Sequence, residues 1–222
     1  MSVVIVAADS WPSRAWELLV LSDKPGRAID AIVCDVGDVV ILFDRDVAAG
    51  IETRYGLPSG SFLLTALKSP ASKLAAIGQI DKTEWVRRLR KTLPLQAIDE
   101  WLDYHGELNQ KLVGLLASAK VAGVRVLFLS NATTRLWDDL SFHGALDLAD
   151  RVFCSADIGL AKPDPRVYRF VADEASLCLA RVMYVDDTAS WVEVGRTLGM
   201  YGHVYETPDR VAQDLARLGV LP

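Results

Sequence analysis

The fold is decided by the stretch Ala31-Ile-Val-Cys-Asp-Val-Gly-Asp-Val-Val-Ile-Leu-Phe-Asp44. Apolar or small residues lead up to Asp35, a polar break containing a glycine follows, and a second apolar run then begins. A short, β-rich apolar run that stops at an acid predicts a buried strand with a carboxylate at its end. Ligands of open α/β sheets bind at the carboxyl ends of the strands. Asp35 is therefore the first candidate functional residue.

The rest of the chain alternates between apolar runs and segments with helical spacing. Strands are expected at 124–129, 151–154, 183–185 and 202–205, with helices at 108–119, 136–142 and 192–198 and helices beginning near 164 and 207. Residues 45–100 show only helical spacing, with helices expected at 47–55, 62–67, 74–77 and 84–92, the second of them stopped by Pro70. Buried strands alternating with helices predict an α/β fold with a parallel sheet and helices on both faces.

Length and spacing also predict the domain organisation. A chain of 222 residues suits one core with an inserted subdomain. We assign residues 30–44 and 106–222 to the core and residues 45–105 to a helical insert. Residues 1–29 form an N-terminal extension, for which a strand and a short helix are expected and no chemistry is assigned.

Composition and charge restrict the classes of function. The formal net charge is −5 and there is no basic run, so nucleic-acid binding is not favoured. The apolar run at 3–8 is too short for a membrane span and no basic residue precedes it, so neither a membrane anchor nor a secretory signal is expected. The three cysteines form no C-x-x-C pair and are interpreted as free thiols, which fits a cytoplasmic location.

Polar residues close three of the predicted strands or the loops after them: Asp35, Ser130 and the pair Asp186-Asp187. Lys162 lies just before a predicted helix. Parallel strands end at one edge of a sheet, so these groups are expected to converge in one crevice. Clustered carboxylates repel one another unless a cation neutralises them, and Mg2+ is the usual cation beside phosphate. A hydroxyl and a lysine can supply a donor and a positive charge to phosphate oxygens.

These residues resemble the four motifs of the haloacid dehalogenase-like superfamily, whose members are mostly aspartate-nucleophile phosphatases. Asp-Val-Gly-Asp-Val at 35–39 is similar to the first motif and Leu-Ser-Asn at 129–131 to the second. Lys162-Pro163 resembles the third motif and Val-Asp-Asp at 185–187 the fourth. The order and spacing agree over roughly residues 30–205. The resemblance implies a Rossmann-like core, with the helical insert as a cap.

The resemblance also implies a role for each acid. Asp35 would be the nucleophile, attacking phosphorus to form an aspartyl-phosphate that water then hydrolyses. Mg2+ would be held by Asp35, the backbone carbonyl of Gly37 and Asp186, with Asp187 as a further ligand or supporting acid. The implied activity is Mg2+-dependent hydrolysis of a small phosphorylated metabolite, for which a sugar phosphate is one candidate.

Ser130 and Lys162 would hold the transferring phosphoryl group, with Asn131 nearby. Phosphoryl transfer depends mainly on positioning and on neutralising negative charge, which agrees with this division of roles. Lys162 would also offset the repulsion between an anionic nucleophile and an anionic substrate.

The sequence departs from the superfamily pattern at Gly37, where most of these phosphatases have a second Asp that protonates the leaving oxygen. Such general acid–base help is typically worth about a hundredfold to ten-thousandfold in rate. Asp38 is the obvious stand-in, but it lies one residue further along. An Asp-x-Gly form is found in a branch of these phosphatases, and a missing acid should favour substrates with good leaving groups.

Two other functions stay open at this point. A haloacid dehalogenase also lacks the second Asp, but it usually has an aromatic residue at the position of Gly37 and dispenses with the acid pair, so Asp186-Asp187 favours a phosphatase. A catalytically weak phosphate-binding or scaffolding protein on the same fold is the other alternative. Substrate choice would come from the insert, where Trp85, Trp101, Tyr104 and His105 are candidate contacts, although core packing is the simpler explanation for each. The sequence does not distinguish a monomer from a homodimer.

Overall fold

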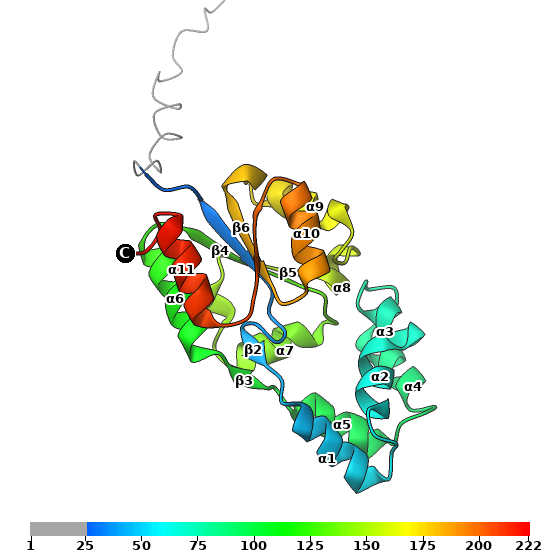
Figure 1. Cartoon of the computed structure of the whole chain (residues 1–222). Helices are drawn as coiled ribbons and strands as arrows, with labels where there is room; N and C mark the ends of the chain where they lie inside the picture. The colour runs from blue at the N-terminus through cyan, green and yellow to red at the C-terminus, as the bar shows by residue number, and fades with distance from the viewer. Residues whose placement is uncertain (1–25) are drawn as a thin grey trace, which may run out of the picture.

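The computed structural model describes residues 26–222, so the strand and helix expected within residues 1–25 lie outside the described part. A five-stranded, fully parallel sheet lies at the centre, in the order β5-β4-β1-β6-β7. Its strands are β1 (Ala31–Cys34), β4 (Arg125–Ser130), β5 (Arg151–Cys154), β6 (Val182–Asp186) and β7 (Tyr201–Val204). The predicted α/β fold is confirmed (Figure 1).

Helices cover both faces of the sheet. One face packs against α6 (Gln110–Val121), α7 (Arg135–Phe142) and α11 (Pro208–Arg217), and the other against α9 (Pro165–Glu174) and α10 (Ala189–Thr197). A hydrophobic cluster lies on each face of the sheet, and alternate residues of β1 pack into the two clusters. Ile32 and Cys34 belong to one cluster, and Ala31 and Val33 belong to the other. All four β1 side chains are buried, as two-sided coverage requires. The core also contains three short helical elements: α8 (Ser155–Ile158) and the 3-10 turns η2 (Leu146–Leu148) and η3 (Leu179–Arg181).

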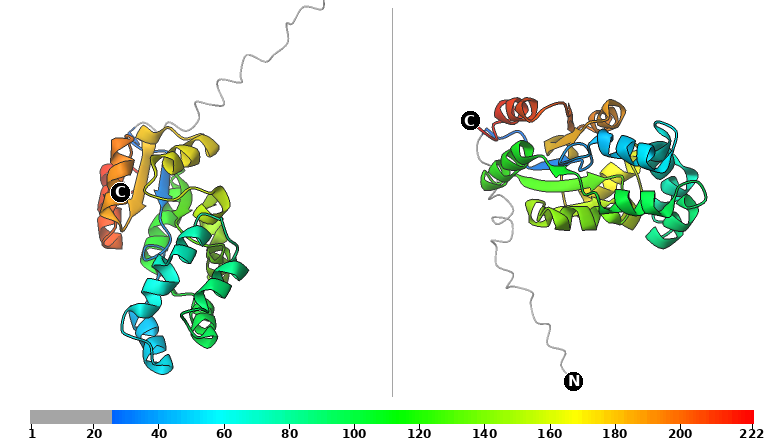
Figure 2. Two further views of the ribbon diagram at one scale, coloured as in Figure 1. Left: turned by 90° about the vertical axis from the view of Figure 1, so that its right-hand side faces the viewer. Right: turned by 90° about the horizontal axis from the view of Figure 1, so that it is seen from below.

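Five helices follow β1 and form a separate helical insert. They are α1 (Arg45–Tyr55), α2 (Ser61–Lys68), α3 (Pro70–Ala75), α4 (Lys82–Leu89) and α5 (Leu95–Asp103). These helices share a hydrophobic cluster of their own. Figure 2 shows the insert projecting from one end of the core. As expected, α2 ends before Pro70, but the next helix begins earlier than the expected Leu74. Ser69 accepts a hydrogen bond from the amide of Ser72, and Pro70 is the first residue of α3.

Two short strands connect the insert to the core. β2 (Ile41–Leu42) enters the insert and β3 (Glu107–Leu108) leaves it, and the two pair antiparallel. Leu108, which was expected in a helix, lies in β3, and α6 begins only at Gln110, after the N-cap Asn109. Gly106 has φ +70, and a Cβ there would lie 2.7 Å from the carbonyl oxygen of Leu42. Glycine is therefore needed at this crossing.

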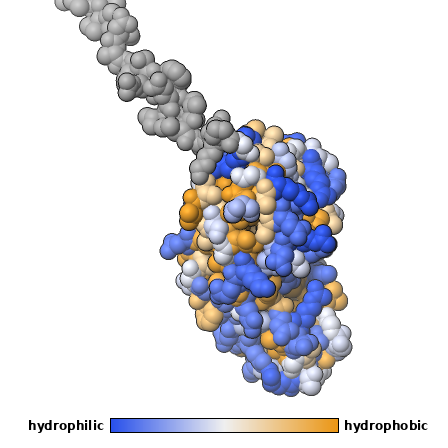
Figure 3. Space-filling view, turned by 60° about the vertical axis from the view of Figure 1, so that its left-hand side comes forward, coloured by the Kyte–Doolittle hydropathy of each residue, from blue (hydrophilic) through white to orange (hydrophobic). Residues whose placement is uncertain are grey.

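The surface of the core is mixed in character. Figure 3 shows hydrophilic residues interspersed with smaller apolar areas on one face of the molecule. Within residues 26–222, no helix combines the length and the apolar character needed to cross a membrane. Residues 27–30 pack on the core, with Ile29 fully buried and the amide of Ala28 bonded to the carbonyl of Leu218.

Candidate active site

The three central strands bring their polar ends to one place. β1 lies between β4 and β6, so Asp35, Ser130 and Asp186 come from adjacent strands. The amide of Asp35 donates to the carbonyl of Val185 at 2.8 Å, which fixes the residue to the end of β6. The expected convergence therefore follows from strand order, and the candidate ligand atoms of Asp35, Asp186 and Asp187 all lie within 4.8 Å of one another.

Lys162 lies beneath these carboxylates and is fully buried. Its Nζ is 2.9 Å from Asp35 Oδ1, 2.7 Å from Asp186 Oδ2 and 3.1 Å from the carbonyl oxygen of Leu129. A buried ammonium is stable only with such partners. Three carboxylates and one ammonium leave a formal charge of −2 on the cluster, which a divalent cation would neutralise.

The acids of the cluster are held by further hydrogen bonds. Asp35 Oδ1 also accepts from the amide of Val36 at 2.7 Å, whereas its Oδ2 has no hydrogen-bond partner within residues 26–222. Asp186 Oδ1 accepts from the amide of Thr188 at 2.8 Å, and its Oδ2 accepts from the Tyr184 hydroxyl. Burial raises the pKa of Asp35 to about 6, against the opposing effect of Lys162. Positive charge is therefore needed nearby to keep this carboxyl ionised at neutral pH.

The oxygen ligands present suit a magnesium ion. Hard cations of this kind take carboxylate and carbonyl oxygens, and three carboxylates meet here. Asp187 is more exposed than the other two, and burial together with the neighbouring acids Asp186 and Asp38 raises its pKa. A bound cation would remove that repulsion. The donor set therefore fits Mg2+.

Asn131 has a contact that the sequence did not reveal. Its side-chain nitrogen donates to the carbonyl of Lys162 at 2.7 Å, and its side-chain oxygen accepts from the amide of Lys162 at 2.8 Å. This amide clamp joins the loop after β4 to the Lys162 loop and so positions the lysine. No residue spacing in the sequence signals the pairing, because the two loops are 31 residues apart. Direct phosphate binding by Asn131 stays a prediction.

A cavity of about 850 Å³ lies above the cluster, between the core and the insert. Asp35, Gly37, Ser130, Asn131 and Asp187 line it from the core side. Lys162 and Asp186 lie deeper and do not line it. The Ser130 hydroxyl makes no hydrogen bond to another residue of the described chain, so it is free to donate to a ligand.

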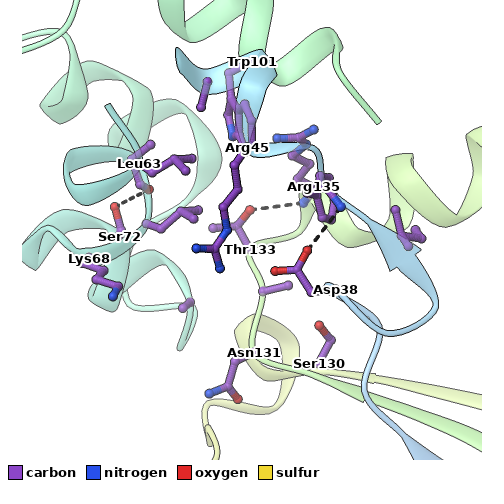
Figure 4. Close-up of a pocket in the computed structure, with 18 of the residues that line it drawn as sticks. Asp38, Arg45, Leu63, Lys68, Ser72, Trp101, Ser130, Asn131, Thr133 and Arg135 are labelled. Atoms are coloured by element: carbon purple, nitrogen blue, oxygen red, sulfur yellow. Dashed lines mark hydrogen bonds between the residues drawn. The ribbon is translucent and has the colours of Figure 1, made fainter. Parts of the chain in front are cut away.

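Asp38 lines the same cavity and is exposed. Its backbone has φ +56, and its Oδ1 accepts from the amide of Phe43 at 3.2 Å (Figure 4). The carboxylate thus helps to hold the turn that leads into β2. A Cβ added at Gly37 would meet no atom within 4 Å, so a side chain can begin at that position without a Cβ clash.

The aromatic candidates in the insert are used mainly in packing. Trp85 and Trp101 are buried in its cluster, although both also reach the cavity wall. The Tyr104 hydroxyl accepts from the amide of Asp44, and His105 bonds Asp139, so neither lines the cavity.

Arg135 is a residue of the cavity wall that the sequence analysis did not single out. Its guanidinium lies over the rings of Phe43 and Trp101 and bonds Asp139 and the carbonyl of Tyr104. It therefore joins α7 of the core to the insert. It is the first residue of α7, just before the helix expected at 136–142, and no motif there gave a sequence signal.

Fold and site together define a hydrolase of the α/β class with an acid cluster at the sheet edge. Residues 29–199 match the family model of the haloacid dehalogenase-like hydrolases. The chain belongs to this family, as its four motifs predicted. The match covers most of the described residues.

Named relatives agree with the family assignment. The chain is similar to phosphatase MT3486 of Mycobacterium tuberculosis, with 39% identity over 115 residues, 48% of this chain and 52% of that protein. It thus aligns with only about half the length of that relative. It is 25% identical over 183 residues to D-ribitol-5-phosphate phosphatase of Bacteroides thetaiotaomicron, covering 77% of this chain and 89% of that one.

A solved structure shares the fold. The HAD family enzyme bt-2542 from Bacteroides thetaiotaomicron, in complex with magnesium and inorganic phosphate, superposes with a TM-score of 0.69. Its sequence identity is 18%, and the match covers 80% of this chain and 94% of that one. At this level of identity the likeness supports the fold alone.

Proposed function

We propose that this hydrolase is a Mg2+-dependent phosphatase that cleaves a small phosphate monoester through an aspartyl-phosphate on Asp35. One observation carries the proposal: Asp35 lies at the floor of a cavity, 2.9 Å from a fully buried lysine and within 4.8 Å of two further carboxylates. Relatives named as phosphatases support the same reaction class.

Asp35 Oδ2 is the attacking atom in this proposal, because Oδ1 is already bonded to Lys162 and the amide of Val36. A new bond forms between Oδ2 and phosphorus, and the bond from phosphorus to the ester oxygen breaks. The leaving oxygen takes a proton from water or from Asp38, since Gly37 supplies none, and departs as an alcohol. Water then cleaves the aspartyl-phosphate, which restores the carboxylate and releases phosphate.

The remaining residues bind and position. The Ser130 hydroxyl donates to a phosphoryl oxygen from the cavity floor, and Lys162 reduces the negative charge that the phosphoryl group meets. Asn131 keeps Lys162 in place through its backbone. Asp35, Asp186, Asp187 and the carbonyl of Gly37 would hold Mg2+, which would supply further neutralisation of the phosphoryl charge. The helical insert would act as the cap that excludes water.

Hydrolysis of an aryl phosphate tests this reaction. We expect turnover with Mg2+, loss of turnover after chelation, and loss of at least about a thousandfold in Asp35→Asn, because the nucleophile is removed. Asp173→Asn, an exposed acid of α9, is the matched control and should retain full activity. An inert wild-type protein across many phosphate esters would favour a phosphate-binding or scaffolding role. Halide release from 2-haloacids without phosphate ester hydrolysis would favour a dehalogenase.

Gly37 predicts a strong dependence on the leaving group. Without an acid at this position, the rate should fall as the pKa of the leaving alcohol rises. Gly37→Asp adds a Cβ that meets no atom within 4 Å, and it should flatten that dependence by speeding the poorest leaving groups. Asp38→Asn reports whether Asp38 already supplies the proton: a steeper dependence in this variant would show that it does. A flat dependence in the wild type would contradict the reasoning.

A further inference from the structure

Two cations on the wall of the cavity have no side-chain partner in the part of the chain that the structure describes. Arg45 is the first residue of α1 and Lys68 the last of α2, and both line the cavity from the insert. Neither makes an ion pair or a hydrogen bond through its side chain with another residue between 26 and 222. Figure 4 shows the Arg45 guanidinium extending between Ser72 of the insert and Thr133 and Asp38 of the core.

The buried acids of the same wall are already occupied. Glu52 accepts from the amides of Gly60 and Phe62 at 2.8 Å, so it caps α2. Asp139 is bonded to Arg135 and His105. Glu52 and Asp139 therefore do not compensate the charges of Arg45 and Lys68. Asp38 and Asp44 also line the cavity, but no ion pair joins either of them to these two cations among residues 26–222, so both cations are available to an anion.

Helix stability does not explain Arg45. A cation in the first turn of a helix faces the positive end of the helix dipole, which disfavours it. Asp44 already provides the N-cap by accepting from the amide of Asp46. Lys68 differs, because a cation in the last turn of α2 is favourable. Arg45 is thus the more informative of the two.

Apolar side chains line the same insert side of the cavity as these cations. Leu63, Leu64 and Leu67 of α2 line the cavity, and Leu64 and Leu67 are 61% and 56% exposed. Large apolar residues exposed side by side toward a cavity are suited to a hydrocarbon segment of a ligand.

We propose that Arg45 and Lys68 bind a second anionic group of the substrate. The substrate class is then a phosphate monoester whose phosphate and second anion, a carboxylate or another phosphate, are separated by a hydrocarbon segment. The inference rests on the proposed function, since the phosphate monoester is assigned to the floor at Asp35 and Ser130. The second anion is bound on the insert, where Arg45 offers two parallel donors to a carboxylate or phosphate.

A matched substrate series tests the proposal. ω-Carboxyalkyl phosphates of increasing length are compared with alkyl phosphates of the same carbon number. In the wild type the ω-carboxyalkyl phosphate of optimal length should have a KM at least about tenfold lower than that of the alkyl phosphate with the same carbon number. Arg45→Gln and Lys68→Gln should remove this preference while leaving the kcat for alkyl phosphates unchanged. Arg90→Gln and Lys91→Gln, exposed cations of the insert outside the cavity, are the controls.

Binding supplies a second readout that needs no turnover. Titration calorimetry with ω-carboxyalkylphosphonates and alkylphosphonates should show the same preference and the same loss in the variants. Equal affinity of the two series for the wild type overturns the proposal. A loss of kcat for alkyl and aryl phosphates in Arg45→Gln also overturns it, because Arg45 would then serve the transferring phosphoryl group. Failure of aryl phosphate hydrolysis with a preserved binding preference would instead count against the proposed reaction alone.

Discussion

Replacement of Lys162 by methionine is expected to destabilise the fold by an amount that depends on pH. The Lys162 ammonium is fully buried and contacts Asp35 Oδ1 at 2.9 Å, Asp186 Oδ2 at 2.7 Å and the Leu129 carbonyl at 3.1 Å. Methionine keeps most of the length of the side chain and removes the charge. The variant therefore buries two carboxylates with no cation between them.

The magnitude follows from the cost of breaking a buried ion pair. Removing one partner costs about 3–5 kcal/mol, because the remaining charge is left uncompensated. The variant can reduce this cost if Asp35 takes a proton, and burial already raises the pKa of Asp35 to about 6 in the presence of Lys162. When an acid has a higher pKa in the folded than in the unfolded protein, the folded state loses stability as the pH rises from about 4 through the folded pKa. The penalty should thus be largest in alkaline solution.

Urea denaturation in chelator, at about pH 8 and about pH 5.5, measures the effect. Lys162→Met should lose about 3–5 kcal/mol relative to wild type at the higher pH and clearly less at the lower one. Asp35→Asn introduced into Lys162→Met should recover about 1–3 kcal/mol, since it removes one of the two facing charges. Lys91→Met, an exposed lysine, should change stability by less than about 0.5 kcal/mol.

Two results would refute this reasoning. One is a loss of stability in Lys162→Met that is the same at both pH values. The other is a double variant, Lys162→Met with Asp35→Asn, that is no more stable than Lys162→Met alone. Either result would mean that Lys162 does not stabilise the fold by neutralising the acid cluster.

Three smaller predictions concern positions around the site and the core. Asn131→Ala removes both bonds to the Lys162 backbone and should cost about 1–3 kcal/mol in urea denaturation, with Asn131→Asp, which keeps only the acceptor, in between. Asp30 has a pKa lowered by hydrogen bonds to its arginine partners, so Asp30→Asn should lower stability by up to about 1 kcal/mol at neutral pH. That difference should disappear as the pH falls through the folded pKa of Asp30, below about 4, and a constant difference would contradict it. Gly106→Ala should lower the melting temperature through strain at φ +70, whereas Gly114→Ala, in an open helical position, should not.

The sequence was sufficient for the core fold and for the convergence of the site. Asp35, Ser130 and Asp186 each end an apolar run, and parallel strands place such ends at one edge whatever the loops do. The sequence could not give the strand order, so it predicted a shared edge, whereas the adjacency of β4, β1 and β6 that brings these groups together came from the structure. Its acids were therefore identified from local pattern and one topological rule.

Contacts between loops escaped sequence reasoning. The Asn131 clamp on Lys162 and the Arg135 contacts with the insert depend on how separate segments meet in three dimensions. Short elements escaped for a different reason: β2 and β3 have two residues each and show no period. Pro70 was interpreted correctly as a boundary, but a proline signals the start of a helix as readily as the end of one.

The structure explains why an aspartate is present at position 38 but not why a glycine is present at position 37. Asp38 has φ +56, a conformation that aspartate tolerates better than most residues, and its carboxylate accepts from the amide of Phe43 at the entry to β2. The turn alone accounts for Asp38. Gly37 has no such account: its φ lies outside the left-handed region, and a Cβ there would contact no atom within 4 Å. Neither backbone strain nor a Cβ contact requires glycine at this position, so the leaving-group dependence of the wild type and of Gly37→Asp is the measurement that shows whether the missing acid reflects the chemistry of the substrate.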